Sequence, residues 1–95
     1  MVIMQFEWDE NKNELNIRKH GVDFEDVKNI FNYPSMTLMD TRDEYGEDRW
    51  QVIGWISAIL GVVVYTERTG NVIRIISARK ATKYEVSLYE KYIKN

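Results

Sequence analysis

The sequence contains no cysteine, one proline, five glycines and a single histidine among its 95 residues. Without cysteine the chain forms no disulfide, thiolate zinc site or iron–sulfur cluster, and it has no cysteine nucleophile. No apolar run reaches the roughly 18 residues of a membrane-spanning helix, and the first residues lack the pattern of a signal peptide. We therefore expect one domain over residues 1–95, located in the cytoplasm and without a membrane partner.

The charges are divided unevenly along the chain, although the net charge is only −2. Residues 1–48 carry twelve acidic and five basic side chains, a net charge of −7. Residues 49–95 carry three acidic and eight basic side chains, a net charge of +5. This asymmetry indicates a basic face built mainly by the second half, unless the fold interleaves the halves and the charges simply scatter over the surface.

Hydrophobic periodicity predicts the element order β-α-α-β-β-β-β-α. The expected strands cover residues 4–8, 36–39, 50–55, 60–66 and 72–78. The expected helices begin after Asp9, Asp23 and Thr82, and the first two end at Gly21 and before Pro34. Early helices followed by hairpin-connected strands favour an α+β fold, with an antiparallel sheet packed against two N-terminal helices and one C-terminal helix.

The side-chain pattern also predicts which helix faces are buried. The first helix is very polar, with Leu15 and Ile17 its only aliphatic residues, so it should lie on the surface with a narrow buried stripe. In the last helix, which Thr82 and Glu85 open as a capping box, one set of apolar side chains has core-facing spacing: Tyr84, Leu88, Tyr89, Tyr92 and Ile93. Most aromatic residues, including Trp8, Trp50 and Trp55, are expected in the core.

Candidate metal ligands are few. His20 is the only histidine, and the acidic loop 40–48 does not match the spacing of a calcium-binding EF-hand. The sequence also lacks glycine-rich phosphate loops. We expect no metal or cofactor and a solvated acidic loop.

Cationic side chains near strand and helix ends are the better candidates for chemistry. Arg79 ends a strand just before the last helix, where arginine and the helix dipole together favour an anion such as phosphate. Arg74 lies on the other face of that strand unless a bulge intervenes, and a cross-strand ion pair is its simpler explanation. His20, beside Lys19, either complements the end of its helix or exchanges a proton near neutral pH.

Three strings of residues together resemble the BrnT family of toxins from bacterial type II toxin–antitoxin systems. The similarity covers roughly residues 4–92, and its motifs are F-E-W-D-x-x-K running on to K-H-G-V-x-F, then G-E-x-R with I-G, then V-Y-T-E-R followed by R-I-I-S-A-R-K-A. The chain departs from the family pattern at residues 55–61, which are apolar where the family usually has a polar hairpin. This segment is either an extra partner contact or a drifted hairpin.

The resemblance implies a RelE-like α+β fold and a ribonuclease that blocks translation. It also implies a ribbon-helix-helix antitoxin (BrnA-like), a complex of two toxins and two antitoxins, and contact with DNA only through the antitoxin. The site candidates carried over are Lys19, His20, Arg49, Arg68 and Arg79.

Metal-independent cleavage by the 2′-OH of the RNA needs a proton acceptor, a proton donor and cations around the phosphate. His20 would act as base or acid, and the arginines would stabilise the charge. Glu67 is a second candidate base, or else an ion-pair partner of Arg68 or Arg49. The alternative function is a catalytically inactive partner and corepressor of a DNA-binding antitoxin.

Overall fold

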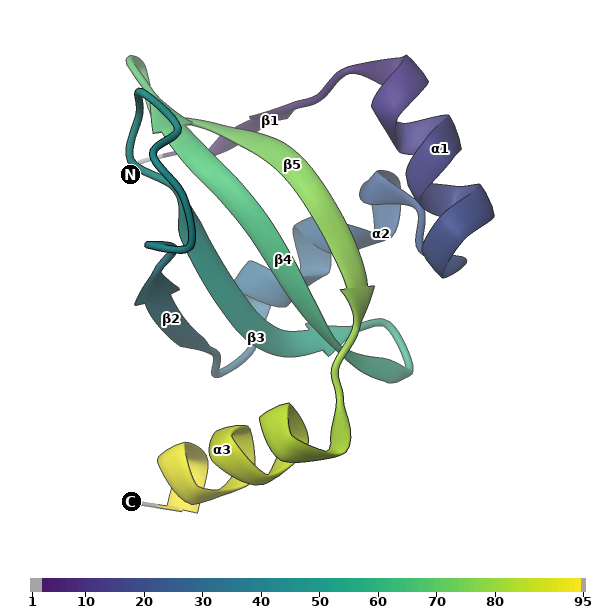
Figure 1. Cartoon of the computed structure of the whole chain (residues 1–95), viewed down its shortest axis with the longest axis vertical. Coiled ribbons are helices and arrows are strands. Elements are labelled where there is room, and N and C mark those ends of the chain that lie inside the picture. The colour runs from purple at the N-terminus through teal and green to yellow at the C-terminus, as the bar shows by residue number, and fades with distance from the viewer. Residues whose placement is uncertain (1–2, 95) are drawn as a thin grey trace.

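The computed structural model describes residues 3–94 and confirms the α+β class. A five-stranded sheet has the order β1-β5-β4-β3-β2. Its strands are β1 (Gln5–Glu7), β2 (Met36–Met39), β3 (Trp50–Ile56), β4 (Ile59–Arg68) and β5 (Val72–Lys80). The helices are α1 (Glu10–His20), α2 (Phe24–Val27), the 3-10 helix η1 (Lys28–Asn32) and α3 (Lys83–Lys94), which lies beyond one end of the strands (Figure 1).

The sheet is mixed, so the expectation of a wholly antiparallel sheet is wrong at one edge. The strands from β2 to β5 pair in antiparallel fashion, whereas β1 runs parallel to β5, with Phe6 opposite Ile73. Both strands of a tight hairpin must be antiparallel, but β1 reaches β5 through most of the chain and is under no such constraint.

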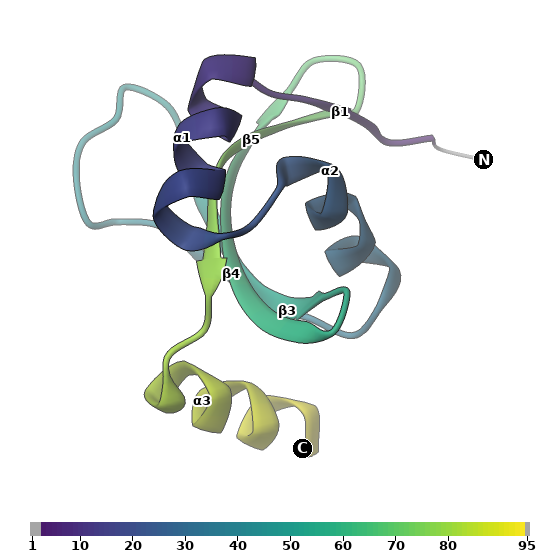
Figure 2. The same ribbon diagram turned by 90° about the vertical axis from the view of Figure 1, so that its right-hand side faces the viewer.

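One face of the sheet carries the main core. The sheet curves around α2 and η1, which lie together on this side (Figure 2). Phe24, Val27 and Ile30 are fully buried there against Val63 and Ile75. The second helix is α-helical for one turn only before it tightens to 3-10 geometry.

Helix α1 is attached to the sheet by asparagine rather than by aliphatic side chains. Leu15 and Ile17 are 60% and 40% exposed, so the expected apolar stripe is absent. Asn16 is buried and accepts from the Ala78 backbone N–H (3.2 Å) while donating to the Ala78 carbonyl (2.8 Å). The Asn16 side chain thus takes the place of a neighbouring strand at the edge of β5. A partner is needed there because β1 has already ended, and the backbone groups at a strand edge require hydrogen bonds.

Helix α3 contributes less to the core than its periodicity predicts. Tyr89 is buried against Ile53 and Leu60, and its hydroxyl donates to the Pro34 carbonyl at 2.7 Å. Tyr84, Tyr92 and Ile93, however, are 71%, 54% and 42% exposed. The expectation for these three is wrong because α3 crosses only the end of the sheet, where one turn meets the strands.

The apolar segment 55–61 forms a β-hairpin whose turn has two residues, Ser57 and Ala58. Ile56 and Leu60 are buried on opposite faces of the sheet, whereas Trp55 remains 43% exposed, contrary to the core expectation for that residue. Ile56 pairs with Ile59 across a turn in which Ser57 has a φ of 52°. Most apolar side chains of this segment are therefore packed into the hydrophobic clusters on the two faces of the sheet.

Candidate functional site

A β-bulge decides which arginines share a face of the sheet. Val64 pairs with Ser77 but Tyr65 pairs with Ile75, so Ile76 is an extra residue in β5. Residues opposite one another in paired strands project to the same face, and the bulge reverses the alternation along β5. The bulge that would overturn the separation of Arg74 from Arg79 is therefore present, and the two arginines project to the same face of the sheet.

We call the resulting surface the arginine face. It is the side of the sheet opposite α2, and the residues that project there from β4 and β5 include Arg68, Arg74, Ser77 and Arg79. The loop 40–49 extends from this side of the sheet (Figure 2).

Arg79 already has an anionic partner within the chain. Its guanidinium donates to both carboxylate oxygens of Glu85, at 2.7 and 2.8 Å. Glu85 also accepts from the backbone N–H of Thr82 (2.9 Å), which confirms the capping box. The arginine lowers the pKa of Glu85 from its ordinary 4.5 to about 2. The anion that Arg79 and the start of α3 bind in this structure is thus the Glu85 carboxylate of the chain itself.

Lys19 and His20 lie in the last turn of α1, which ends at Gly21 in the left-handed conformation, as expected. Both side chains line a shallow groove of about 210 Å³ between α1 and β5, together with Ile76 and Ser77. Ser77 belongs to the arginine face and is two residues from Arg79. The fold therefore brings the histidine to the border of the surface that carries the arginines.

Arg49, Arg68 and Arg74 also take part in ion pairs. Arg74 donates to Glu7 on the neighbouring strand, confirming its expected cross-strand pair, and Arg68 approaches the same carboxylate at 3.9 Å. Arg49 donates to Glu47 at 3.2 Å and stacks over the ring of Tyr45, 4.1 Å from its centroid.

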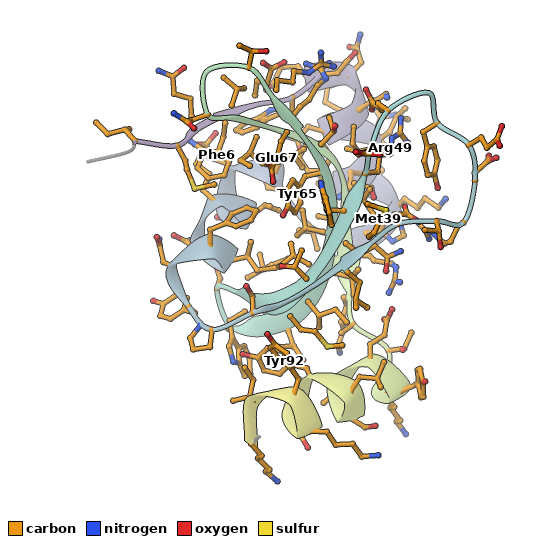
Figure 3. The ribbon with its side chains drawn as sticks, turned by 90° about the vertical axis from the view of Figure 1, so that its left-hand side faces the viewer. Phe6, Met39, Arg49, Tyr65, Glu67 and Tyr92 are labelled. Carbon is orange, nitrogen blue, oxygen red and sulfur yellow. The ribbon has the colours of Figure 1, made fainter. Side chains whose placement is uncertain are left out.

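Glu67 is not brought to the arginine face. It pairs with Ile73 and projects to the side of Tyr65 and Phe6, where Figure 3 shows all three. Glu67 and Arg68 do line one groove of about 350 Å³ at the end of β4. Within residues 3–94, no ion pair joins Glu67 to Arg68 or Arg49.

The loop 40–49 exposes four of its acids, as expected of a solvated loop, namely Asp43, Glu44, Glu47 and Asp48, but its first acid is buried. Its first residue, Asp40, is 5% exposed and accepts hydrogen bonds from Arg42 and Tyr45. Sequence reasoning missed this centre because it treated Asp40 as one more acid of the loop. The pattern of β2 gives no signal for this burial, because Thr37, Leu38 and Met39 are all exposed. In the part of the chain that is described, no three His, Asp or Glu side chains gather as metal ligands.

Among residues 3–94 there is also no helix with the length and apolar character needed to cross a bilayer.

Known proteins share both the fold and the sequence pattern of this chain. The fold is shared with a crystal structure of the Brucella abortus ribonuclease toxin BrnT, at 27% identity and a TM-score of 0.68 over 85% of this chain and 100% of that one. A family model described as the ribonuclease toxin BrnT of type II toxin–antitoxin systems matches residues 8–85. The chain thus belongs to the BrnT family of ribonuclease toxins. No curated protein matches it.

Proposed function

We propose that the chain is an endoribonuclease that cuts RNA without a metal ion, using the 2′-OH of the RNA as nucleophile. The observation that carries this proposal is the bulge at Ile76, which sets Arg74 and Arg79 on one face beside the groove of His20. Family membership supplies the ribonuclease activity. Arginine, which keeps its charge and donates in a fork, is suited to a phosphate.

The reaction needs two proton transfers around one phosphorus. The 2′-oxygen loses its proton to a base and bonds to phosphorus, while the bond from phosphorus to the 5′-oxygen of the next nucleotide breaks. That 5′-oxygen takes a proton, leaving a 2′,3′-cyclic phosphate and a 5′-hydroxyl end. We assign one of the transfers to His20, with Lys19 beside it and Arg79 stabilising the charge on the phosphate oxygens.

The other candidates have supporting roles in this proposal. Arg68 projects to the arginine face and Arg49 ends the loop beside it, and we propose that both bind phosphates farther along the RNA. Glu67 projects to the opposite side of β4, so we propose it as a base only for RNA that enters the groove it shares with Arg68.

The test is RNA cleavage by purified, antitoxin-free protein in excess EDTA. We expect cleavage to continue in EDTA, to produce cyclic phosphate ends, and to fall on the order of 100-fold or more in both His20→Ala and Arg79→Ala. Lys28→Gln is the control, since it removes one cation from η1 on the far side of the sheet. Cleavage abolished by EDTA, or wild-type rates in both variants, would contradict the proposal.

The family implies an antitoxin partner. We propose that it is a ribbon-helix-helix protein, that two toxins and two antitoxins assemble, and that DNA is bound only through the antitoxin. We further propose that RNA cleavage in the cytoplasm blocks translation. Light scattering of the co-expressed complex gives its stoichiometry, and pulse labelling after toxin induction measures protein synthesis.

A catalytically inactive corepressor is the second candidate. The observation in its favour is that Arg49, Arg74 and Arg79 each have a carboxylate partner within the chain, which competes with a phosphate. Expression without antitoxin separates the two functions, because only a ribonuclease should arrest growth.

A further inference from the structure

The proposed reaction leaves one groove of the described structure without a role. This groove measures about 450 Å³ and lies where β4 turns into β5, mainly on the side of the sheet that faces η1. We call it the aromatic groove, because Phe31 of η1 and Tyr65 of β4 line it, together with Ile73 and Glu67. Its volume lies within the roughly 300–1,000 Å³ of small-molecule sites, so it has room for a ring system such as a nucleobase.

The aromatic side chains of this groove are held in place by contacts between their rings. Phe31 meets Tyr65 edge to face, with 5.3 Å between the ring centroids, and meets Phe6 at 5.7 Å. Tyr65 and Ile73 are buried and form the floor of the groove, whereas Phe31 is only half-buried. The accessible part of an anchored ring is a surface on which a nucleobase can stack, whatever its sequence.

Glu67 is an exposed carboxylate among apolar neighbours. Ile73 lies directly opposite it in the sheet, Phe6 lies opposite Ile73, and Tyr65 precedes it on the same face, as Figure 3 shows for the three labelled residues. Within residues 3–94, its carboxylate forms neither a hydrogen bond nor an ion pair. Because an ionised carboxylate only accepts hydrogen bonds, a ligand that binds here must supply the donors.

Guanine is the RNA base whose Watson–Crick edge fits a carboxylate. Its N1–H and N2–H₂ groups donate side by side, which matches the two oxygens of Glu67. Uracil sets its N3–H between two carbonyl oxygens, and adenine and cytosine each set a ring-nitrogen acceptor beside the amino group. These acceptors would face the carboxylate and repel it, so the same contact that favours guanine disfavours the other three bases.

A cation beside Glu67 provides a place for the phosphate. Arg68 also lines the aromatic groove, and its side chain is 48% exposed. Its carboxylate neighbour, Glu7, lies 3.9 Å away and already accepts from Arg74. Successive residues of a strand project to opposite faces, so Arg68 reaches this groove from the arginine face. A nucleotide whose phosphate binds Arg68 can therefore place its base in the groove, and the arginine offsets repulsion between Glu67 and the RNA backbone.

We propose that the aromatic groove binds a guanine base of the RNA, which stacks on Phe31 and donates its N1–H and N2–H₂ groups to Glu67. Bound in this way, Glu67 selects a nucleotide and takes no proton from the 2′-oxygen. This inference rests on the proposed function, because it names the nucleotide that the same ribonuclease recognises.

The test is sequencing of the ends produced when purified, antitoxin-free protein cuts a pool of random-sequence RNA. We expect wild type to favour guanine about tenfold at one position relative to the cut. Glu67→Gln should abolish this preference and favour adenine instead, because an amide pairs one donor with one acceptor, while total cleavage falls less than about threefold. Glu90→Gln is the matched control, since Glu90 is exposed on α3, beyond the opposite end of the strands (Figure 1).

Two further measurements separate the hydrogen bonds from the stacking. Inosine, which lacks the N2 amino group, should slow wild-type cleavage of a defined substrate about fivefold at that position and leave Glu67→Gln unaffected. Phe31→Leu should slow cleavage about fivefold or more with the preference for guanine retained, because stacking tolerates every base. Phe31 also packs against the main core, so circular dichroism must first confirm that this variant is folded.

The outcomes distinguish this inference from the proposed function. Glu67→Gln that slows cleavage equally at all sequences and keeps the guanine preference would overturn the inference, and would indicate that Glu67 takes a proton. Equal cleavage at all four bases by wild type would also overturn it. Both results leave the proposed function standing, whereas wild-type protein that cuts no RNA would overturn the proposed function and the inference with it.

Discussion

At the scale of single residues, carboxylates organise the cations of this protein. Asp40 orients Arg42, Glu85 orients Arg79, and Glu7 joins Arg74 to the first strand. Each pair lies on or beside the arginine face, and each combines an ion pair with hydrogen bonds of fixed geometry. The same contacts that position these arginines also stabilise the fold, so their variants need measurements of stability as well as of RNA binding.

The Arg79–Glu85 pair makes stability depend on pH. Because the pKa of Glu85 is about 2 in the folded chain and 4.5 ordinarily, the pair stabilises the fold fully above about pH 4.5 and progressively less toward pH 2. We expect Glu85→Gln to lower the free energy of unfolding by about 1–2 kcal/mol at pH 7. The deficit should shrink as the pH falls through this window.

Urea unfolding of both proteins at a series of pH values measures this deficit. Glu25→Gln is the control, because Glu25 pairs with Lys28 on the exposed surface, where an ion pair contributes little. A deficit at pH 7 that persisted unchanged to pH 2 would show that Glu85 acts through something other than its charge.

Asn16 is expected to matter more than the larger aliphatic residue beside it. Asn16→Ala leaves the buried N–H and carbonyl of Ala78 without their side-chain partner, and should cost about 2–4 kcal/mol. Leu15→Ala, at a position that is 60% exposed, should cost less than about 0.5 kcal/mol. Thermal unfolding of the two variants ranks them, and the reverse order would mean that α1 is held by apolar contacts.

At the scale of elements, short connections set the geometry of the sheet. The bulge at Ile76 changes the face of every residue after it in β5, and the turn at Ser57 joins the antiparallel strands β3 and β4. In this turn the first central residue has a positive φ and the second does not, the pattern of a type II′ turn, where glycine is preferred.

Ser57→Gly should therefore stabilise the protein by about 0.5–1 kcal/mol, because glycine adopts a φ of 52° without the steric cost that a Cβ brings. Ala58→Gly is the matched control, since its φ is not positive and the change only loosens the unfolded chain. Chemical denaturation checks both, and a Ser57→Gly variant less stable than wild type would rule out this account of the turn.

At the scale of the whole molecule, stability is unevenly distributed. The central strands β3 and β4 are covered by α2 and η1 on one face, whereas α3 is attached through Ala81, Val86 and Tyr89. Tyr92 and Ile93, farther along the helix, remain exposed, and Figure 3 shows Tyr92 on α3. Elements with few buried side chains open at lower free energy than the core.

Hydrogen exchange should accordingly be faster in α3 than in β3 and β4 of the antitoxin-free protein. Tyr89→Phe, which removes the hydrogen bond to the Pro34 carbonyl, should accelerate exchange in α3 further while β4 stays protected. Mass spectrometry of the exchanging amides resolves the two regions. Simultaneous acceleration of α3 and β4 would mean that the helix and sheet unfold as one unit.

The sequence by itself determined the elements of this protein and its family. Capping side chains at Asp9, Asp23 and Thr82 and the period of the strands are local features, so the α+β class could be predicted from them. The family motifs were also read from the sequence alone, and the family model confirms them.

Only the tertiary structure decided which side chains meet. The bulge that joins Arg74 to Arg79, the burial of Asn16 in place of Leu15, and the exposure of Tyr92 all depend on strand register and on where a helix crosses the sheet. These are set by contacts between residues far apart in sequence, such as Asn16 with Ala78. Local periodicity contains no information about such contacts, because it records the faces of an element and not the neighbour that covers them.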